Sequence, residues 1–337
     1  MSEIPRGAIR FNTDSNKPEL WDGSQWAEFQ LSTPNLGRSV DTEPGARGVF
    51  GGGGAPAAVN TIDYVNISST GDAIDFGDLL FTSFINGSCS SATRGLWAGS
   101  RPSTNTINFV TIASTGDATN FGDLTDPREG ADGMGSATRG IFSGGGDHPS
   151  PGSFEVTMDY VTIASTGDAR DFGDLTQARM FPAAFSSPTR GCIAGGYIAP
   201  GSDSRSNVID FVTIATLGNA QDFGDMTAVG QTPTGTANPI RGVFNISQND
   251  SHNTTLNYVT IATTGNAAVF GDLTETKYAA AGAASPTRGV IAGSYSPAIT
   301  NVINYYLFAT EGDAVDFGDL TQSRGHLSGC SNAHGGL

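Results

Sequence analysis

Residues that could carry out chemistry are scattered along the chain and fall into no catalytic or metal-binding pattern. Seven could ligate a metal ion: His148, His252, His326, His334, Cys89, Cys192 and Cys330. Their spacing matches no zinc site, and the sequence has no Gly-x-Ser-x-Gly elbow for a nucleophilic serine. The triplet Asp-Phe-Gly begins at Asp75, Asp171, Asp222 and Asp316. The lysine and phosphate-loop motifs that accompany this triplet in phosphotransferases are absent, so we expect no enzyme activity, no cofactor and no metal.

The charge balance excludes two classes of partner. Lys and Arg number 17 against 33 Asp and Glu, a net charge of −16, so no nucleic-acid binding through phosphates is expected. No apolar run of about 18 residues occurs, so we expect no membrane insertion. The segment from Met1 to Arg6 lacks the basic and apolar regions of a signal peptide. Synthesis in a reducing cytoplasm is therefore expected.

Two short motifs recur six times each and define an internal repeat. Arg-Gly begins at Arg47, Arg94, Arg139, Arg190, Arg241 and Arg288. Phe-Gly-Asp begins at Phe76, Phe121, Phe172, Phe223, Phe270 and Phe317. Between them lies a segment with a central Asp or Asn, at Asp63, Asn108, Asp159, Asp210, Asn257 and Asn304.

The spacing of these motifs separates fixed from variable parts of the repeat. The interval from each Phe-Gly-Asp to the next Arg-Gly is constant, as between Phe76 and Arg94. The interval from the central Asp or Asn to the following Phe is constant too, as between Asp63 and Phe76. The interval from the Arg to the central Asp or Asn changes from repeat to repeat. It is shortest in the second repeat and longest in the third and fourth. All length variation therefore falls in one loop per repeat.

Each repeat reads as four short β-strands separated by turns. The segment around Asn108 is apolar on both faces, with Ile107 and Phe109 pointing one way and Val110 and Ile112 the other. A sheet buried on both faces is what a blade between two other blades requires. We predict an all-β fold, a six-bladed β-propeller with four-stranded blades. The alternative is an open β-solenoid, whose coils are commonly shorter, about 20–30 residues.

Closure of the ring requires one strand from a chain end to join the first repeat. The last Phe-Gly-Asp is followed by residues 326–333 without a further repeat, and we expect this strand to pair with the strand at Arg47. The segment 38–43, just before Arg47, is the competing candidate.

The Arg and Asp present in all six repeats have two interpretations. The Asp residues are Asp78, Asp123, Asp174, Asp225, Asp272 and Asp319, and the Arg residues are those of Arg-Gly. They form either a charged ring at the axis that binds an ion or a ligand, or structural contacts within or between blades. Identity in every repeat favours the structural role, because binding sites usually break repeat symmetry. The repeated Phe is expected to pack between blades.

The variable loops are the predicted ligand-binding surface, because all six connect equivalent strands and so lie on one face. Their candidate residues are Arg101, His148, Phe154, Tyr197, Asp203, Arg205, Asp250, His252 and Tyr295. The alternative is that these loops are neutral and solvated.

Residues 1–36 fall outside the repeat, and residues 37–337 form the propeller in this interpretation. Alternating apolar residues and two turns predict a small β-meander, with Phe11, Trp21, Trp26 and Phe29 as its attachment residues. A segment this short cannot bury two Trp side chains alone. It is expected to dock on the propeller, on copies of itself or on another protein.

Two stretches resemble known families. The segment Gly7 to Lys17, followed by Trp21-Asp22-Gly23-Ser24-Gln25-Trp26, resembles a short module of bacteriophage tail-fibre and other virion proteins. The repeat, with Asp-Phe-Gly-Asp-Leu and Thr-Arg-Gly, resembles repeats in structural proteins of marine cyanobacterial phages. It is also distantly similar to Kelch repeats through paired glycines such as Gly144-Gly145, but lacks their usual Tyr and Trp.

The resemblance implies a virion protein made in the host cytoplasm and joined to other virion proteins through its N-terminal segment. We expect a tail fibre or tail-associated adhesin that contacts a host-surface glycan or protein through the variable loops. The alternative is a purely structural capsid decoration or tail accessory protein. A polysaccharide-degrading enzyme is disfavoured, because no paired catalytic acids are identifiable. Self-association into a homo-oligomer is expected, and a trimer is the state common among fibre proteins.

Overall fold

The structure, a computed structural model of the chain, describes residues 5, 7–12, 17–21, 24–28, 47–54, 57–84, 86–147, 154–198, 204–231, 233–247 and 253–332. The chain divides into two compact units, Met1–Val40 and Asp41–Leu337. The first unit contains a three-stranded antiparallel meander, β1 (Ile9–Asn12), β2 (Lys17–Trp21) and β3 (Trp26–Glu28). The second is a propeller of six four-stranded antiparallel blades, as the repeat predicts.

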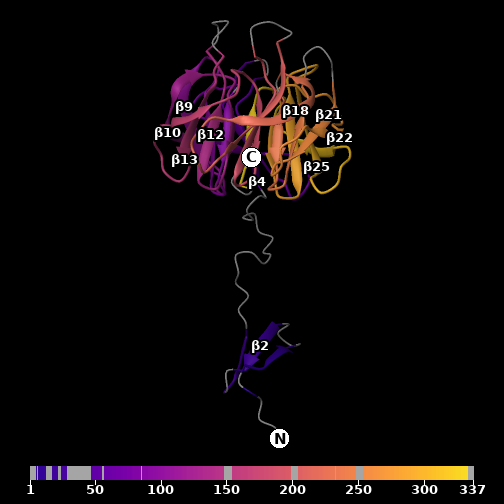
Figure 1. The fold of residues 1–337 in the computed structure, drawn as a ribbon. Helices are drawn as coiled ribbons and strands as arrows, with labels where there is room; N and C mark the ends of the chain where they lie inside the picture. Colours follow the sequence, from indigo (N-terminus) through magenta and orange to yellow (C-terminus); the bar gives the residue numbers. More distant parts are fainter. Residues whose placement is uncertain are drawn as a thin grey trace. The chain divides into compact units, whose positions relative to one another are not determined.

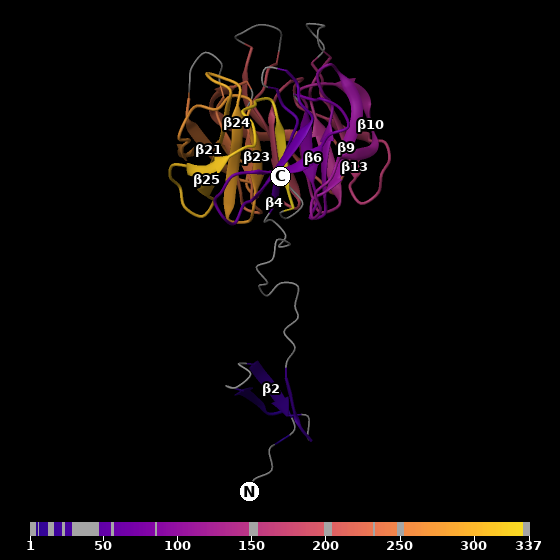
Figure 2. The ribbon, with the colours of Figure 1, turned by 180° about the vertical axis from the view of Figure 1, so that it is seen from behind.

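Each blade has the same strand order from the axis outward, and Figures 1 and 2 show the blades arranged around a ring. The inner strands are β7 (Gly87–Ser90), β11 (Asp132–Gly135), β15 (Ala183–Ser186), β19 (Gly235–Ala237), β23 (Ala281–Ala284) and β27 (Ser328–Ser331). The second strands are β8 (Arg94–Ala98), β12 (Arg139–Ser143), β16 (Arg190–Ala194), β20 (Arg241–Asn245), β24 (Arg288–Ser294) and β4 (Arg47–Gly51). Small residues fill the inner strands because the strands crowd together around the axis.

The outer half of each blade carries the remaining two strands. The third strands are β5 (Thr61–Asn66), β9 (Thr104–Thr111), β13 (Thr157–Thr162), β17 (Ser206–Thr213), β21 (Thr255–Thr260) and β25 (Thr300–Leu307). The outermost are β6 (Ile74–Asp78), β10 (Thr119–Arg128), β14 (Arg170–Asp174), β18 (Gln221–Gly230), β22 (Ala268–Asp272) and β26 (Val315–Asp319). We number the blades by their second strand, so that blade 1 contains β4 and blade 6 contains β24.

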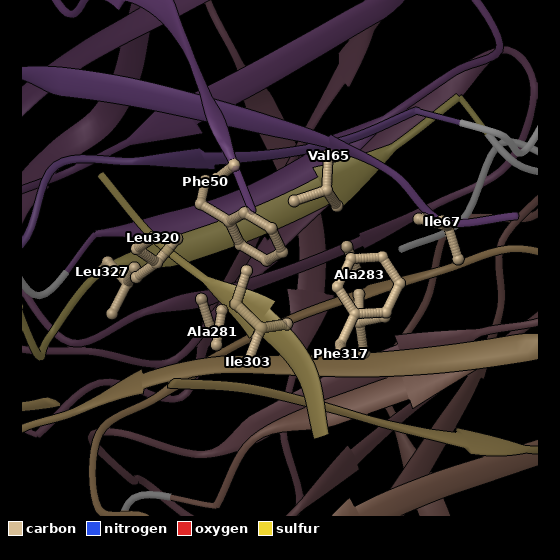
Figure 3. Close-up of a cluster of buried hydrophobic side chains, with 12 residues drawn as sticks. Phe50, Val65, Ile67, Ala281, Ala283, Ile303, Phe317, Leu320 and Leu327 are labelled. Atoms are coloured by element: carbon tan, nitrogen blue, oxygen red, sulfur yellow. The ribbon is translucent and has the colours of Figure 1, made fainter. Parts of the chain in front are cut away.

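The ring closes through the C-terminal strand, as expected. β27 pairs with β4 in blade 1, with Cys330 opposite Val49. Figure 3 shows the core at this seam, where Phe50 and Val65 of blade 1 meet Ile303 and Phe317 of blade 6. The competing segment 38–43 lies outside the described residues.

The repeated Arg reaches from its own blade to the next. Its guanidinium donates to the carbonyl at the end of the neighbouring third strand in all six cases, at 2.9 Å from Arg47 to Ile112 and 3.2 Å from Arg288 to Ile67. The same guanidinium lies 4.4–4.9 Å from the centre of an aromatic ring of its own blade. This Arg is therefore an interblade clamp, placed away from the axis.

The Phe-Gly-Asp motif forms the outer part of the same interface. Phe76 is buried between blades 1 and 2 with Trp97 and Val110. A Cβ on Gly77 would lie 2.5 Å from the carbonyl oxygen of the next blade's Gly116, so only Gly permits this approach. The N–H of Asp78 donates to Asp117 Oδ1 at 3.1 Å, and the other five blades repeat this bond with Asp or Asn. The repeated Arg and this repeated Asp thus serve separate contacts.

Buried ion pairs involve a different Arg, seven residues after the repeated Phe. Arg128 lies 2.8 Å from the central Asp159, and equivalent pairs join Arg179 to Asp210 at 2.9 Å and Arg324 to Asp63 at 3.0 Å. Each pair joins one blade to the next. At the other three interfaces the Arg position holds Ser83, Gly230 or Lys277, and the central residue of the following blade is then Asn108, Asn257 or Asn304. A buried carboxylate therefore occurs at the central position only where a buried guanidinium reaches it, since an unpaired buried charge is costly.

We predict that Arg139→Ala lowers the free energy of unfolding by about 2 kcal/mol, through loss of the interblade hydrogen bond to Ile214 and the stacking on Tyr160. Arg170→Ala is the matched control, because Arg170 is exposed on the outer strand of the same blade. Denaturant unfolding of both variants checks the prediction. Equal stability of the two variants would contradict the clamp.

We predict that Asp159→Asn costs about 3 kcal/mol, because it leaves the Arg128 guanidinium buried without its carboxylate. Combining it with Arg128→Ser reproduces the pair found between blades 1 and 2, Ser83 and Asn108, and should restore most of the loss. Unfolding of the two single variants and the double variant gives the coupling energy. Additive effects of the two substitutions would show that the residues are not coupled.

Candidate functional site

The variable loops and the entrances to the inner strands lie at the same end of the ring, because strand direction alternates across each blade. We call this end the loop face. Five of the nine predicted ligand residues are described: Arg101, Phe154, Tyr197, Arg205 and Tyr295. The other four, His148, Asp203, Asp250 and His252, lie outside the described residues.

A cavity of about 80 Å³ lies where the inner strands begin, on the axis at the loop face. Every blade contributes to this axial pocket, through Ser88, Asp132, Phe181, Thr234, Ala280 and His326. Since a water molecule occupies about 30 Å³ of liquid, the pocket accommodates two or three waters or a small functional group.

Among the described residues that line this pocket, Asp132 is the acidic one. Its Oδ1 accepts the N–H of Gly133 at 2.8 Å, and its Oδ2 accepts the N–H of Ala184 in the next blade at 2.7 Å. Loss of hydration raises the pKa of Asp132 to about 7, against the opposing effect of these backbone hydrogen bonds. Asp132 also raises the pKa of the buried Cys89 thiol, although burial contributes more to that shift.

His326 belongs to the segment that leads into the closing strand β27, and it lines the same pocket. Its ring contacts three aromatic rings, with centroids at 4.6 Å for Tyr295, 6.0 Å for Phe84 and 6.1 Å for Tyr278. Burial lowers the pKa of His326 to about 4, and the nearby Arg101 adds to the effect. The imidazole is therefore neutral near pH 7 and acts as a polar aromatic surface.

The rim of the pocket gathers most of the described loop residues. Arg101 forms an ion pair of 2.9 Å with the buried Glu129 and lies over Phe84. Tyr197 packs edge-on against the pocket residue Phe181, with ring centroids 6.1 Å apart, and pairs through its backbone with Arg205. Arg101 and Tyr295 thus adjoin His326, while Tyr197 and Arg205 adjoin Phe181.

Phe154 lies apart from this arrangement. It forms a backbone bridge with Gly146 inside the variable loop of blade 3. The loop residues therefore converge on the pocket in blades 2, 4 and 6.

Backbone strain is concentrated at the pocket. Phe181, Ala279 and His326 adopt φ values of 54–55°, and they are the non-Gly residues with positive φ among those described. All three line the axial pocket. The N–H of Phe181 donates to the carbonyl of Gly130 at 2.7 Å, and that of His326 to Ala279 at 2.7 Å. Left-handed non-Gly residues persist where surrounding contacts fix them, and they cluster at functional sites.

Asp132, Phe181 and His326 were not predicted from the sequence as members of a binding site. The six inner strands hold Gly, Ser, Ala, Cys, Met, Phe and Thr, and Asp132 is the charged residue among them. That single departure from a small, uncharged pattern was the signal available in the sequence. Phe181 and His326 carried no comparable signal, because the positive φ that places them is a property of the folded backbone.

No protein-family profile matches this sequence, and no similar curated protein is found. Within the described ranges, no group of three or more His, Cys, Asp or Glu side chains is placed to hold a metal ion. The same part of the chain contains no helix with the length and apolar character needed to cross a membrane. Function must therefore be inferred from the loop face and the axial pocket.

We predict that Asp132 makes stability fall as pH rises from about 4 to about 7, because the folded state retains a proton that the unfolded state has released. The Asp132→Asn variant lacks this contribution. The difference in unfolding free energy between wild type and variant should decrease by up to about 4 kcal/mol across that range and stay constant above it. The contribution of His326 to stability rises with pH between about 4 and 6.5, because its pKa is lowered in the folded state. His326 is present in wild type and variant, so its contribution cancels in the difference. A pH-independent difference would contradict the assignment.

Proposed function

We propose that this protein is a non-enzymatic virion component, a tail fibre or tail-associated adhesin, that binds a host-surface molecule through its loop face. The observation that carries the proposal is that repeated and variable residues occupy different places in the propeller. The residues repeated in every blade are engaged in interblade contacts. The residues that differ between blades, including Arg101, Tyr197 and Tyr295, gather around the axial pocket on one face.

The positions of the first and last described propeller residues also distinguish the loop face from the opposite end of the ring. Arg47 begins β4 and Asn332 follows β27, and both lie at the end of the ring opposite the loop face. The N–H of Arg47 donates to Asn332 Oδ1 at 2.9 Å, so the two ends of the propeller meet there. The first and last described residues of the propeller therefore lie at the end of the ring opposite the loop face.

The N-terminal meander is the proposed attachment unit. Trp21 and Trp26 are both half-buried, with ring centroids 5.5 Å apart, and Arg10 lies 4.3 Å from the Trp26 ring centre. Two large aromatic side chains that a three-stranded sheet leaves partly exposed are suited to a protein interface. Attachment to other virion proteins and self-association into a homo-oligomer, such as a trimer, would use this surface. Phe11 lies in β1, and Phe29 lies outside the described residues.

The proposal predicts that the purified full-length protein competes with phage particles for adsorption to host cells. Tyr295→Ala should weaken this competition at least fivefold, because Tyr295 is 46% exposed on the loop face. Leu217→Ala is the control, since Leu217 is 56% exposed in a turn at the opposite end of the ring. Equal competition by the two variants would rule out the loop face as the binding surface.

Gold-labelled antibody fragments against the propeller locate the protein on intact particles. Label at the tail together with competition for adsorption supports host recognition. Label over the head, with adsorption unaffected by the protein, would overturn that role and leave a capsid decoration protein. Particles without label would overturn the virion assignment itself.

A further inference from the structure

The axial pocket contains an acid that lacks the cationic partner found at the buried acids elsewhere. Among the described residues, the buried Asp63, Asp159 and Asp210 each contact an Arg within 3.0 Å. Glu129 contacts Arg101 in the same way. Asp132 instead receives backbone N–H groups of Gly133 and Ala184, which carry no net charge. A cationic group from outside the chain would therefore supply a stabilising charge that these contacts of Asp132 lack.

The walls of the pocket match a small cationic group. Phe181 presents an aromatic surface, and Pro182 and Pro233 add apolar contacts. His326 is neutral near pH 7 and does not compete for Asp132. Ser88 and Asn86 also line the pocket. The Ser88 hydroxyl donates to the carbonyl of Gly329, and the Asn86 side-chain oxygen accepts from the Ser328 hydroxyl, so each oxygen keeps a lone pair. A carboxylate beside an aromatic wall and neutral acceptors is the chemistry that recognises an ammonium group.

The size of the pocket selects among amines. A volume of about 80 Å³ admits an ammonium group with part of an unbranched alkyl chain. In an amine attached directly to a sugar ring, the ring begins one bond from the nitrogen, so the ring must come to the mouth of the pocket with the ammonium group. The lysine side chain carries its ammonium on a four-carbon stem and can reach into the pocket while its backbone stays outside.

We propose that the axial pocket binds the protonated amine of a lysine side chain on a partner protein, with Asp132 as its counter-ion and Phe181 as its aromatic wall. The inference rests on the proposed function in that the loop face is the binding face. It makes that function more specific, because it names a protein partner presenting lysine as the host-surface molecule.

The test uses n-butylammonium chloride as the probe, titrated into the full-length protein at pH 8 and followed by amide NMR. At this pH Asp132 is ionised and the amine is protonated. Binding should shift the amide signals of Ala131, Gly133 and Ala184 in the wild type. Neutral n-butanol, which has a similar shape, should bind at least tenfold more weakly. Equal binding of n-butanol, or the absence of shifts with n-butylammonium at concentrations of tens of millimolar, would overturn the proposal.

Two variants assign the site. Asp132→Asn should weaken n-butylammonium binding at least tenfold, whereas Asp75→Asn, at an exposed acid of an outer strand, should leave it unchanged. Phe181→Leu keeps an apolar side chain and should weaken binding severalfold, which tests the pocket independently should Asp132→Asn unfold. Unchanged affinity in both pocket variants would place the amine elsewhere.

Adsorption competition separates this inference from the proposed function. Loss of competition in both Asp132→Asn and Tyr295→Ala supports a lysine-bearing partner at the pocket. Loss in Tyr295→Ala alone would retain the adhesin and overturn the lysine-binding inference. Butylammonium binding without competition by the wild type would overturn the adhesin role and its lysine-bearing partner, leaving the pocket as an amine site only.

Discussion

The contact between one blade and the next is the interaction on which the rest of this structure depends. A guanidinium such as that of Arg47 crosses to a carbonyl of the following blade, and Phe76 is buried between the two sheets. The backbone of Phe-Gly-Asp pairs with the next blade's turn, where Gly116 donates to the carbonyl of Phe76 at 2.8 Å. An isolated four-stranded sheet would expose its apolar faces, so every blade needs a neighbour on each side. The contact therefore fixes both the repeated residues and the need for a closed ring.

Closure connects this constraint to the functional site. β27 belongs to the end of the chain, yet it completes blade 1 and brings His326 to the axis. The pocket combines this last segment with Asp132 of blade 3 and Phe181 of blade 4. A binding site assembled from all six blades exists only while the ring is closed. Because the repeated residues maintain the ring, the loops and the pocket can differ from blade to blade without loss of the fold.

The six blades, the four strands in each and closure by the C-terminal strand could be predicted from the sequence. The constant spacing of the motifs defines the repeat, and strands that are apolar on both faces indicate sheets packed between other sheets. The sequence was not sufficient for contacts that only some blades make. The pair of Arg128 with Asp159 was hidden, since the Arg position holds Ser83 in blade 1. The axial pocket was hidden as well, because its residues come singly from distant repeats and Phe181 is placed by a left-handed backbone. The spacing of repeated motifs does not predict which non-repeated side chains meet at the loop face, and the proposed function depends on those side chains.

Native-state hydrogen exchange at the closing seam tests the central claim, that the site depends on a ring closed by the last strand. Strands near a chain end fray by default, and their amides then exchange through local opening. In a closed ring, the amides of Cys330 and Val49 should exchange only on global unfolding, at the same opening free energy as Phe185 in the inner strand of blade 4. Markedly faster exchange at Cys330 than at Phe185 would show that the ring opens at this seam, and would contradict the account.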